Sequence, residues 1–397
     1  MPPTRQLTMP TSTAVHSKPS CSEDVGLYVH VPFCARRCHF CAFYLVIQEK
    51  RRIEGYVTGL KNEIGLWGSQ EEFQFRKISS VYFGGGTPTV LTPGQFSDIL
   101  GVLRSQWAFD PNVEITVEST PELLNREKVY ALKMAGVTRL SLGVQSFEPR
   151  ERERLGLSPG TSHIGEAVSS AKKSGLNNIN LDVIYGIPGQ TLSSWKDSLR
   201  RALELEPTHL SCYALSLEEG TRLYGQWKQG RLCHADPEEE FTYQLEAEDQ
   251  LHQSGFSRYE ISNWARPGFV CRHNLRYWEG VDYLGLGPSA QSYVLGVRWG
   301  NISDLTEYSR QLASERLPIQ EKEVLSWIQQ QKERVIFGLR KMNGVPLEWV
   351  ENLQEDLEWS RTVQRMVGRK LLGQADARYV LTQTGRRFAD TVCQELL

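Results

Sequence analysis

Along this chain, six short apolar runs are separated by longer stretches in which apolar residues recur at helical spacing. The apolar runs cover 27–31, 78–83, 113–117, 140–144, 179–184 and 210–214. Helical spacing covers 53–66, 93–103, 126–135, 163–174 and 191–205, with Gly136 and Gly175 at expected helix ends. Strands that alternate with helices form a parallel sheet. The pattern therefore predicts an α/β fold, a partial TIM-type (β/α)6 barrel over residues 25–300.

Residues that can take part in binding or catalysis follow or end these predicted strands, except that Asp182 lies within the fifth strand. They are Cys34, the run Gly84-Gly85-Gly86-Thr87, Glu118, Gln145, Asp182 and Ala214. A barrel brings the C-terminal ends of its strands to one face, where active sites gather. The shared placement predicts one functional site at that face. Glycines after a strand also allow close backbone approach, so we expect free N–H groups of residues 84–87 to receive a carboxylate.

The pattern changes after about residue 300. Residues 305–313 and 327–339 have helical spacing, and 361–397 predicts a helix, a turn at 374–376, a strand at 378–382 and a final helix. We expect a separate, mostly helical, winged-helix-like domain over residues 301–397. Its arginines would suit nucleic acid, but the whole chain has a net charge of −2. No nucleic-acid partner is therefore predicted.

The first 24 residues are rich in Pro, Ser and Thr and lack the apolar centre of a secretion signal. They predict a disordered tail. No apolar run approaches the roughly 18 residues of a spanning helix. We therefore expect a cytoplasmic protein without a membrane span.

Three of the eight cysteines stand close together as Cys34, Cys38 and Cys41, a C-x3-C-x2-C spacing. One loop with this spacing can bring three thiolates to three irons of a [4Fe–4S] cluster and leave the fourth iron open. Arg36 and Arg37 would offset the negative charge. The alternative is a zinc site with His39 as the fourth ligand, although its ring is close in sequence to the three thiols.

The segment Tyr28-Val-His-Val-Pro-Phe-Cys34, together with this spacing, resembles the radical SAM superfamily. Within it, the chain resembles the branch of oxygen-independent coproporphyrinogen III oxidases and HemW heme chaperones, from about Leu27 to the C-terminus. The resemblance implies a partial barrel with a C-terminal appendage, a [4Fe–4S] cluster and S-adenosylmethionine (SAM) beside it.

The resemblance also implies which residues contact SAM. Tyr28, Gly85 and Glu118 match contacts to a first SAM, and Phe40, Gly86, Thr87, Gln145, Asp182 and Ala214 match contacts to a second SAM in the oxidases. One position departs from the family pattern. Leu157 stands where the family carries an arginine near the second SAM, which weakens the prediction of that second site.

Two features separate the oxidases from the HemW proteins. Phe43 occupies the place of the oxidase's fourth cysteine, which argues against an oxidase. The run 273–278 resembles the HNxxYW motif of HemW proteins, so His273, Asn274, Tyr277 and Trp278 are expected at heme. A neutral imidazole is a good iron ligand, and aromatic rings stack on a porphyrin. Two alternatives stay open here: Cys271 as the axial ligand, and His273 as a packed structural histidine.

The resemblance thus implies a heme chaperone whose partners are heme and client hemoproteins, respiratory ones among them, with room for a peripheral membrane contact. The first alternative is a coproporphyrinogen III oxidase that decarboxylates propionates by radical chemistry. The second is a radical SAM methyltransferase that uses a second SAM as the methyl donor, and it is weakened by Leu157.

Overall fold

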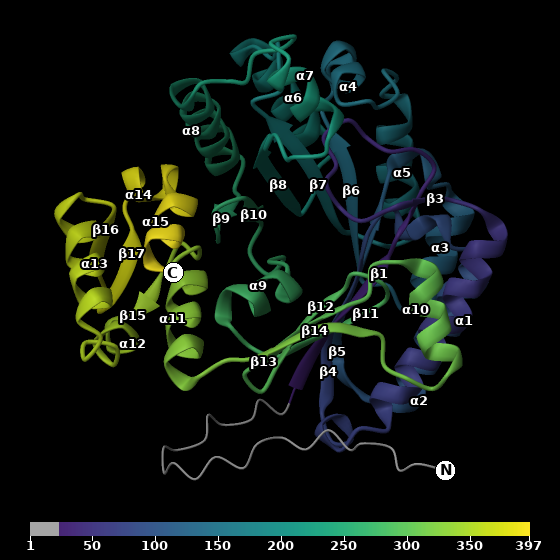
Figure 1. Cartoon of the computed structure of the whole chain (residues 1–397). Helices are drawn as coiled ribbons and strands as arrows, with labels where there is room; N and C mark the ends of the chain where they lie inside the picture. Colours follow the sequence, from purple (N-terminus) through teal and green to yellow (C-terminus); the bar gives the residue numbers. More distant parts are fainter. Residues whose placement is uncertain (1–23) are drawn as a thin grey trace.

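The computed structural model describes residues 24–397. The predicted tail lies outside the described residues, apart from Asp24, with which the first strand begins. Within the described range, a curved sheet of twelve strands forms the larger part of the molecule (Figure 1). The six predicted strands are confirmed as neighbouring parallel strands, namely β1 (Asp24–Val31), β4 (Lys77–Gly85), β5 (Ala108–Ser119), β6 (Arg139–Gln145), β7 (Asn178–Tyr185) and β8 (His209–Ala214).

Helices connect these strands and cover one face of the sheet (Figure 1). They are α1 (Lys50–Gly68), α2 (Pro93–Gln106), α3 (Arg126–Ala135), α4 (Pro149–Arg154), α5 (Ser162–Lys173) and α6 (Leu192–Glu204), followed after β8 by α7 (Arg222–Lys228) and α8 (Pro237–Gln253). Gly136 ends α3 in the left-handed conformation, with φ +104°, as predicted. Short 3-10 turns η1 (Glu71–Phe73), η2 (Pro88–Val90) and η3 (Pro121–Leu123) complete the connections.

The hydrophobic core is a shell between the sheet and these helices. On β7, Ile179, Leu181 and Val183 belong to that core, whereas Asn180 and Asp182 bond to polar side chains of neighbouring strands. Successive side chains of a strand point to opposite faces, so every second residue enters the space enclosed by the curved sheet. We call this space the lumen, and its lining is mainly polar.

The sheet continues beyond the six strands on both sides. Beside β8 lie β10 (Asn263–Ala265) and β9 (Ser257–Arg258), both antiparallel to their neighbours. Beside β1 lie the parallel β11 (Tyr283–Leu286) and then the antiparallel β12 (Gln291–Val294), β13 (Val297–Asn301) and β14 (Ile319–Val324). In the described part of the chain, β14 and β9 are the two edges of the sheet. The predicted partial barrel is therefore confirmed as an open one.

A second core lies in the C-terminal part, drawn in yellow in Figure 1, and runs from Val335 to Leu396. Its elements are α11 (Trp327–Gly338), β15 (Val345–Pro346), α12 (Leu347–Glu351), α13 (Leu357–Gly368), β16 (Leu372–Ala375), β17 (Arg378–Leu381), α14 (Gln383–Arg387) and α15 (Ala389–Leu396). Helices around a small antiparallel sheet in residues 327–397 agree with a winged-helix-like arrangement.

Residues 301–324 lie with the barrel and not with the second core. Helix α10 (Leu305–Ala313) buries Tyr308 and Leu312 in the core of the barrel, and β14 pairs with β13. We propose a domain boundary near Leu325, where the sequence alone suggested 300. Among the helices of residues 24–397, none is long and apolar enough to cross a bilayer.

Candidate functional site

The three clustered cysteines lie on a loop that leaves β1 at the C-terminal end of the strand. Cys34 ends the two-residue strand β2 (Phe33–Cys34), which pairs in parallel with β3 (Val46–Ile47). The N–H of Gln48 donates to the Cys34 carbonyl at 2.9 Å. These bonds close the base of the loop and hold Cys38 and Cys41 at the mouth of the barrel.

The three thiols influence one another electrostatically. Burial, together with the nearby Cys41 and Cys34, raises the pKa of Cys38 to about 11. Burial also raises the pKa values of Cys34 and Cys41, while Arg37 acts in the opposite direction on both. The seven cysteines of the described residues are all free thiols. Three partly buried thiols on one loop, near a guanidinium, are the kinds of group that bind a negatively charged cluster.

His39 is turned away from the three sulfurs. Its Nδ1 lies 3.0 Å from the carbonyl of Arg154, and its Nε2 lies 3.0 Å from Nη1 of Arg222. Both ring nitrogens therefore anchor the loop to α4 and α7. Within residues 24–397, no three His, Cys, Asp or Glu side chains converge around a single ion. His39, the fourth ligand in the zinc alternative, thus has both ring nitrogens engaged with other residues, whereas a cubane would place each thiolate on a different iron.

The glycine run after β4 packs tightly against β1 and β2. A Cβ at Gly85, whose φ is +106°, would lie 2.6 Å from the His30 ring, and one at Gly86 would lie 2.6 Å from the carbonyl oxygen of Phe33. The N–H of Gly86 donates to Val31 and that of Thr87 to Phe33. The expectation that these two N–H groups are free for a carboxylate was therefore wrong.

The glycines instead place one hydroxyl beside the cluster loop. Thr87 Oγ1 lies 3.5 Å from Cys34 Sγ, and this contact lowers the pKa that burial raises in Cys34. Only residues without a Cβ at 85 and 86 allow the two segments to approach this closely.

Two carboxylates, Glu118 and Asp182, lie inside the lumen. Tyr82 donates a hydrogen bond of 2.7 Å to Glu118 Oε1, and Asn180 donates one of 2.8 Å to Asp182 Oδ1. Burial and, to a smaller extent, the Asp182 charge raise the pKa of Glu118 to about 7. Burial likewise raises the pKa of Asp182. The lumen thus offers two oriented acceptors to a ligand that carries positive charge and hydroxyl groups.

The other predicted SAM residues lie around the same mouth. Tyr28 points into the lumen and stacks on Tyr82, with ring centroids 6.2 Å apart. Gln145 ends β6 in the left-handed region, with φ +66°, a strained conformation that is common at binding sites. Ala214 is exposed at the end of β8.

An apolar cluster lies beside the cluster loop and includes Leu155, Leu215 and Leu223. Phe40 and Leu157 both pack against it. The position where the family carries an arginine is therefore apolar in this chain, as the departure at Leu157 indicated.

His273 lies on α9 (Arg272–Glu279), which covers the opposite end of the lumen, the floor. Its side chain is 1% exposed. Nδ1 is 2.9 Å from Ser80 Oγ, and Nε2 is 2.9 Å from the Tyr277 hydroxyl. Its ring stacks on Tyr82 at 5.3 Å. Burial lowers the pKa of His273 to about 3. In this conformation the imidazole is neutral, and neither nitrogen is free to bind iron.

The four motif residues do not converge on one surface. Tyr277 shares the inward face of α9 with His273. Trp278 faces the C-terminal domain, where the Arg340 guanidinium lies 4.8 Å from the centre of its ring. The backbone of Asn274 donates to the thiol of Cys271. Cys271 is itself fully buried, so it is no more accessible than His273.

Sequence reasoning missed most of the lumen. His30, Ser141, Asn180, His209 and Ser211 all point inward and bond to one another or to predicted site residues. These residues recur at every second position within strands that were recognised only as apolar runs. Alternation of polar and apolar residues along each strand was the sequence signal that would have identified them.

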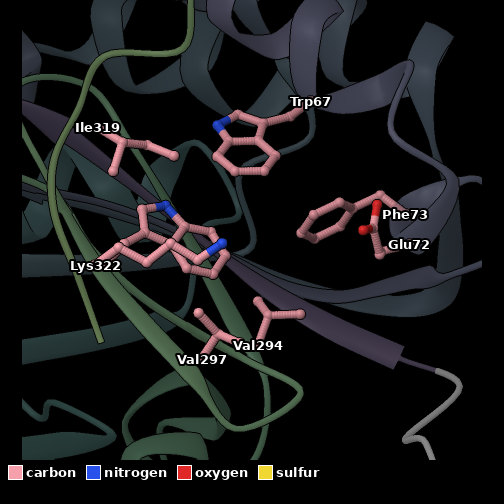
Figure 2. Close-up of a pocket in the computed structure, with 8 residues that line it drawn as sticks. Trp67, Glu72, Phe73, Val294, Val297, Ile319 and Lys322 are labelled. Carbon is pink, nitrogen blue, oxygen red and sulfur yellow. The ribbon is translucent and has the colours of Figure 1, made fainter. Parts of the chain in front are cut away.

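A cavity outside the lumen is shown in Figure 2. It lies between α1 and the antiparallel strands, and Trp67, Phe73, Val294, Trp299 and Ile319 surround it. Its volume is about 30 Å³, which is room for a water molecule and not for an organic ligand. It holds none of the predicted site residues.

Comparison with known proteins agrees with this geometry. Residues 28–202 match the radical SAM superfamily. The heme chaperone HemW of Lactococcus lactis is 31% identical over 93% of this chain and 96% of its own length. The heme chaperone HemW of Mycobacterium tuberculosis is 32% identical over 96% of each chain. Coproporphyrinogen III oxidase (HemN) from Escherichia coli, a radical SAM enzyme, superposes with a TM-score of 0.82 at 24% identity, over 95% of this chain and 91% of that one. The likeness to that oxidase supports the fold. The two chaperones are similar in sequence over almost the whole chain, which shows that this chain belongs to the HemW family of the radical SAM superfamily.

Proposed function

We propose that this protein is a heme chaperone that binds heme and passes it to client hemoproteins, with a [4Fe–4S] cluster and SAM at the barrel mouth. The observation that carries the proposal is the match, over more than nine-tenths of the chain, to relatives named heme chaperones. Heme is the cargo in this proposal, and the cluster and SAM are resident groups.

Each group has proposed ligands among the residues described above. Cys34, Cys38 and Cys41 hold the cluster, which when bound supplies an electron for SAM chemistry. Glu118 and Asp182 accept hydrogen bonds from SAM, and Tyr28, Gln145 and Thr87 line its site. The neutral imidazole of His273 becomes the axial ligand of heme once α9 has moved and one of its two present bonds has opened. Tyr277, Trp278 and Asn274 flank it on the same helix.

Phe43 supports a chaperone over an oxidase. Its side chain is 68% exposed on the cluster loop, and it offers no sulfur where the oxidase carries its fourth cysteine. The likeness to the oxidase HemN is one of fold, at 24% identity. Decarboxylation of coproporphyrinogen is therefore the alternative activity against which the proposal is tested.

The test is a hemin titration of the anaerobically reconstituted protein, followed by absorbance in the Soret region. We expect saturable binding near one equivalent, and we expect His273→Ala to weaken it by at least about tenfold. His252→Ala is the matched control, because His252 is exposed on α8. Cys271→Ser tests the alternative axial ligand.

Unchanged hemin affinity in His273→Ala would remove His273 from the heme site. No saturable binding by the native protein, together with decarboxylation of coproporphyrinogen, would favour the oxidase.

A further inference from the structure

Hydrogen bonds at the N-terminus of α9 and along one of its faces fix the helix against the floor of the lumen. We call this position of the helix the seated position. Glu114 Oε1 accepts from the N–H of Arg272 at 3.0 Å and from that of His273 at 3.3 Å. Arg276 donates to Asp24 at 2.9 Å and to Ser79 at 2.7 Å, near the starts of β1 and β4. The helix therefore plugs the floor, at the end of the barrel opposite the cluster loop.

A first set of contacts connects this plug to the mouth. The His273 ring, held by Ser80, supports the ring of Tyr82, which lies 5.3 Å away at an angle of 29°. The Tyr82 hydroxyl in turn donates to Glu118 at 2.7 Å. Tyr28 stacks on both rings. The position of the Glu118 carboxylate thus depends on Tyr82, and the ring of Tyr82 stacks on His273 of α9.

A second, independent connection is a chain of hydrogen bonds in which all donors point the same way. The N–H of Cys271, at the start of α9, lies 3.3 Å from the Tyr259 hydroxyl oxygen. That hydroxyl lies 2.8 Å from His209 Nε2, and His209 Nδ1 lies 2.6 Å from Asn180 Oδ1. The Asn180 amide donates to Asp182 at 2.8 Å.

Because Asn180 Oδ1 can only accept, His209 donates through Nδ1, and the neutral ring then accepts the Tyr259 proton at Nε2. This series of hydrogen bonds ends at the Asp182 carboxylate, whose negative charge strengthens the preceding hydrogen bonds. Burial lowers the pKa of His209 well below its usual value, so the ring stays neutral and keeps the direction of the chain.

We infer that the seating of α9 in the floor and the occupancy of the mouth by SAM are coupled through these two side-chain relays, so that SAM and heme at His273 disfavour each other's binding. The inference rests on the proposed function, because it takes His273 as the heme ligand. The two carboxylates have the SAM-binding geometry only while α9 is seated. Ligation of iron by His273 requires α9 to leave its seat.

The direction of the effect follows from linkage. A ligand that binds the seated state better than the unseated state shifts the population toward the seated state. SAM carries a sulfonium and an ammonium group, which favour the ionised carboxylates at the receiving end of both relays. By reciprocity, heme at His273 lowers the affinity for SAM by the same factor as SAM lowers the affinity for heme.

The test compares hemin titrations of the cluster-loaded protein with and without saturating SAM. We expect SAM to weaken hemin binding at least about fivefold, within the usual range of couplings between sites. We also expect SAM, without hemin, to slow amide hydrogen exchange across α9. Tyr259→Phe removes one hydroxyl from the second relay and should reduce both effects of SAM. Tyr243→Phe is the matched control, because that buried hydroxyl donates to Gln190 outside the lumen.

Hemin affinities that agree within about twofold with and without SAM, in a protein whose His273→Ala variant loses hemin, would overturn the coupling and leave the chaperone proposal standing. Tighter hemin binding in SAM would also overturn it. If the native protein bound no hemin, the proposed function would fail. The exchange of α9 would then still decide the coupling, since unchanged exchange on addition of SAM contradicts it.

Discussion

Glu118 is the lumen side chain whose charge should respond to pH near neutrality. Burial raises its pKa to about 7, so the carboxyl is mostly neutral at pH 6 and mostly ionised at pH 8. The ionised form attracts cationic SAM. The apparent Kd for SAM should therefore fall about tenfold from pH 6 to pH 8. Equilibrium dialysis at a series of pH values measures this, and Glu118→Gln should flatten the profile. An affinity that weakens with rising pH would contradict it.

The cluster cysteines offer a second test at single residues. Cys38→Ser removes one of three thiolates, and we expect the reconstituted variant to lose most of its bound iron and sulfide. Cys233→Ser is the control, because that thiol is exposed and lies outside the loop. Iron and sulfide analysis after anaerobic desalting gives the readout. Full iron retention in Cys38→Ser would remove Cys38 from the ligand set.

Individual site residues differed in how well the sequence predicted them. Cys34, Cys38 and Cys41 stand out because their spacing is itself the signal. Asn180 and His209 escaped notice because their roles come from side chains on neighbouring strands, which only the sheet register brings together. His273 was expected at heme, with a packed structural histidine as the open alternative, and its burial arises from residues such as Ser80, which is 193 positions away in the sequence.

Among the elements, α9 depends most on a single buried carboxylate. Glu114 accepts from two N–H groups at the start of this helix, where the helix dipole favours negative charge. Glu114→Gln should cost about 1–2 kcal/mol of stability and speed hydrogen exchange in α9. Chemical denaturation and exchange measure the two effects. Asp304→Asn, at the start of α10, is the control and should leave exchange in α9 unchanged.

The elements of the barrel were predictable because local pattern and tertiary role agree. The predicted helix at 126–135 has the bounds of α3, and the strand ends fall within five residues of those expected. The short strand β16 was missed, because its pairing with β17 is what defines it. The turn expected at 374–376 lies one residue later, where Asp376 and Ala377 both have positive φ.

At the scale of the whole molecule, α9 contacts the barrel on one side and α11 on the other, beside further contacts such as the ion pair between Arg386 and Glu248. Trp278 and Arg340 form part of this joint. Trp278→Ala should cost about 2–3 kcal/mol and separate the unfolding of the two domains. Calorimetry should then resolve two transitions. Trp227→Ala, on the exposed side of α7, should keep the native unfolding profile. A single transition in Trp278→Ala would mean that other contacts couple the domains.

At this scale the sequence predicted two domains with a boundary at residue 300, and we propose a junction about 25 residues later. Residues 301–324 have the composition of surface elements, and nothing local assigns them to either core. Glu63 of α1 ties residues 301–324 to the barrel, because it accepts hydrogen bonds from Asn301 at 2.6 Å and from Tyr308 at 2.6 Å. Such a long-range contact is invisible to local patterns.

The separation of the polar lumen from the apolar shell bears on how such a protein changes during evolution. Alternate residues of each strand serve the two purposes, so folding and ligand chemistry draw on different side chains of the same segment. A substitution at Ser141 or Asn180 alters what the lumen holds and leaves the layer beneath the helices intact. Lineages built on this sheet can therefore exchange one cargo or reaction for another through changes confined to the lumen.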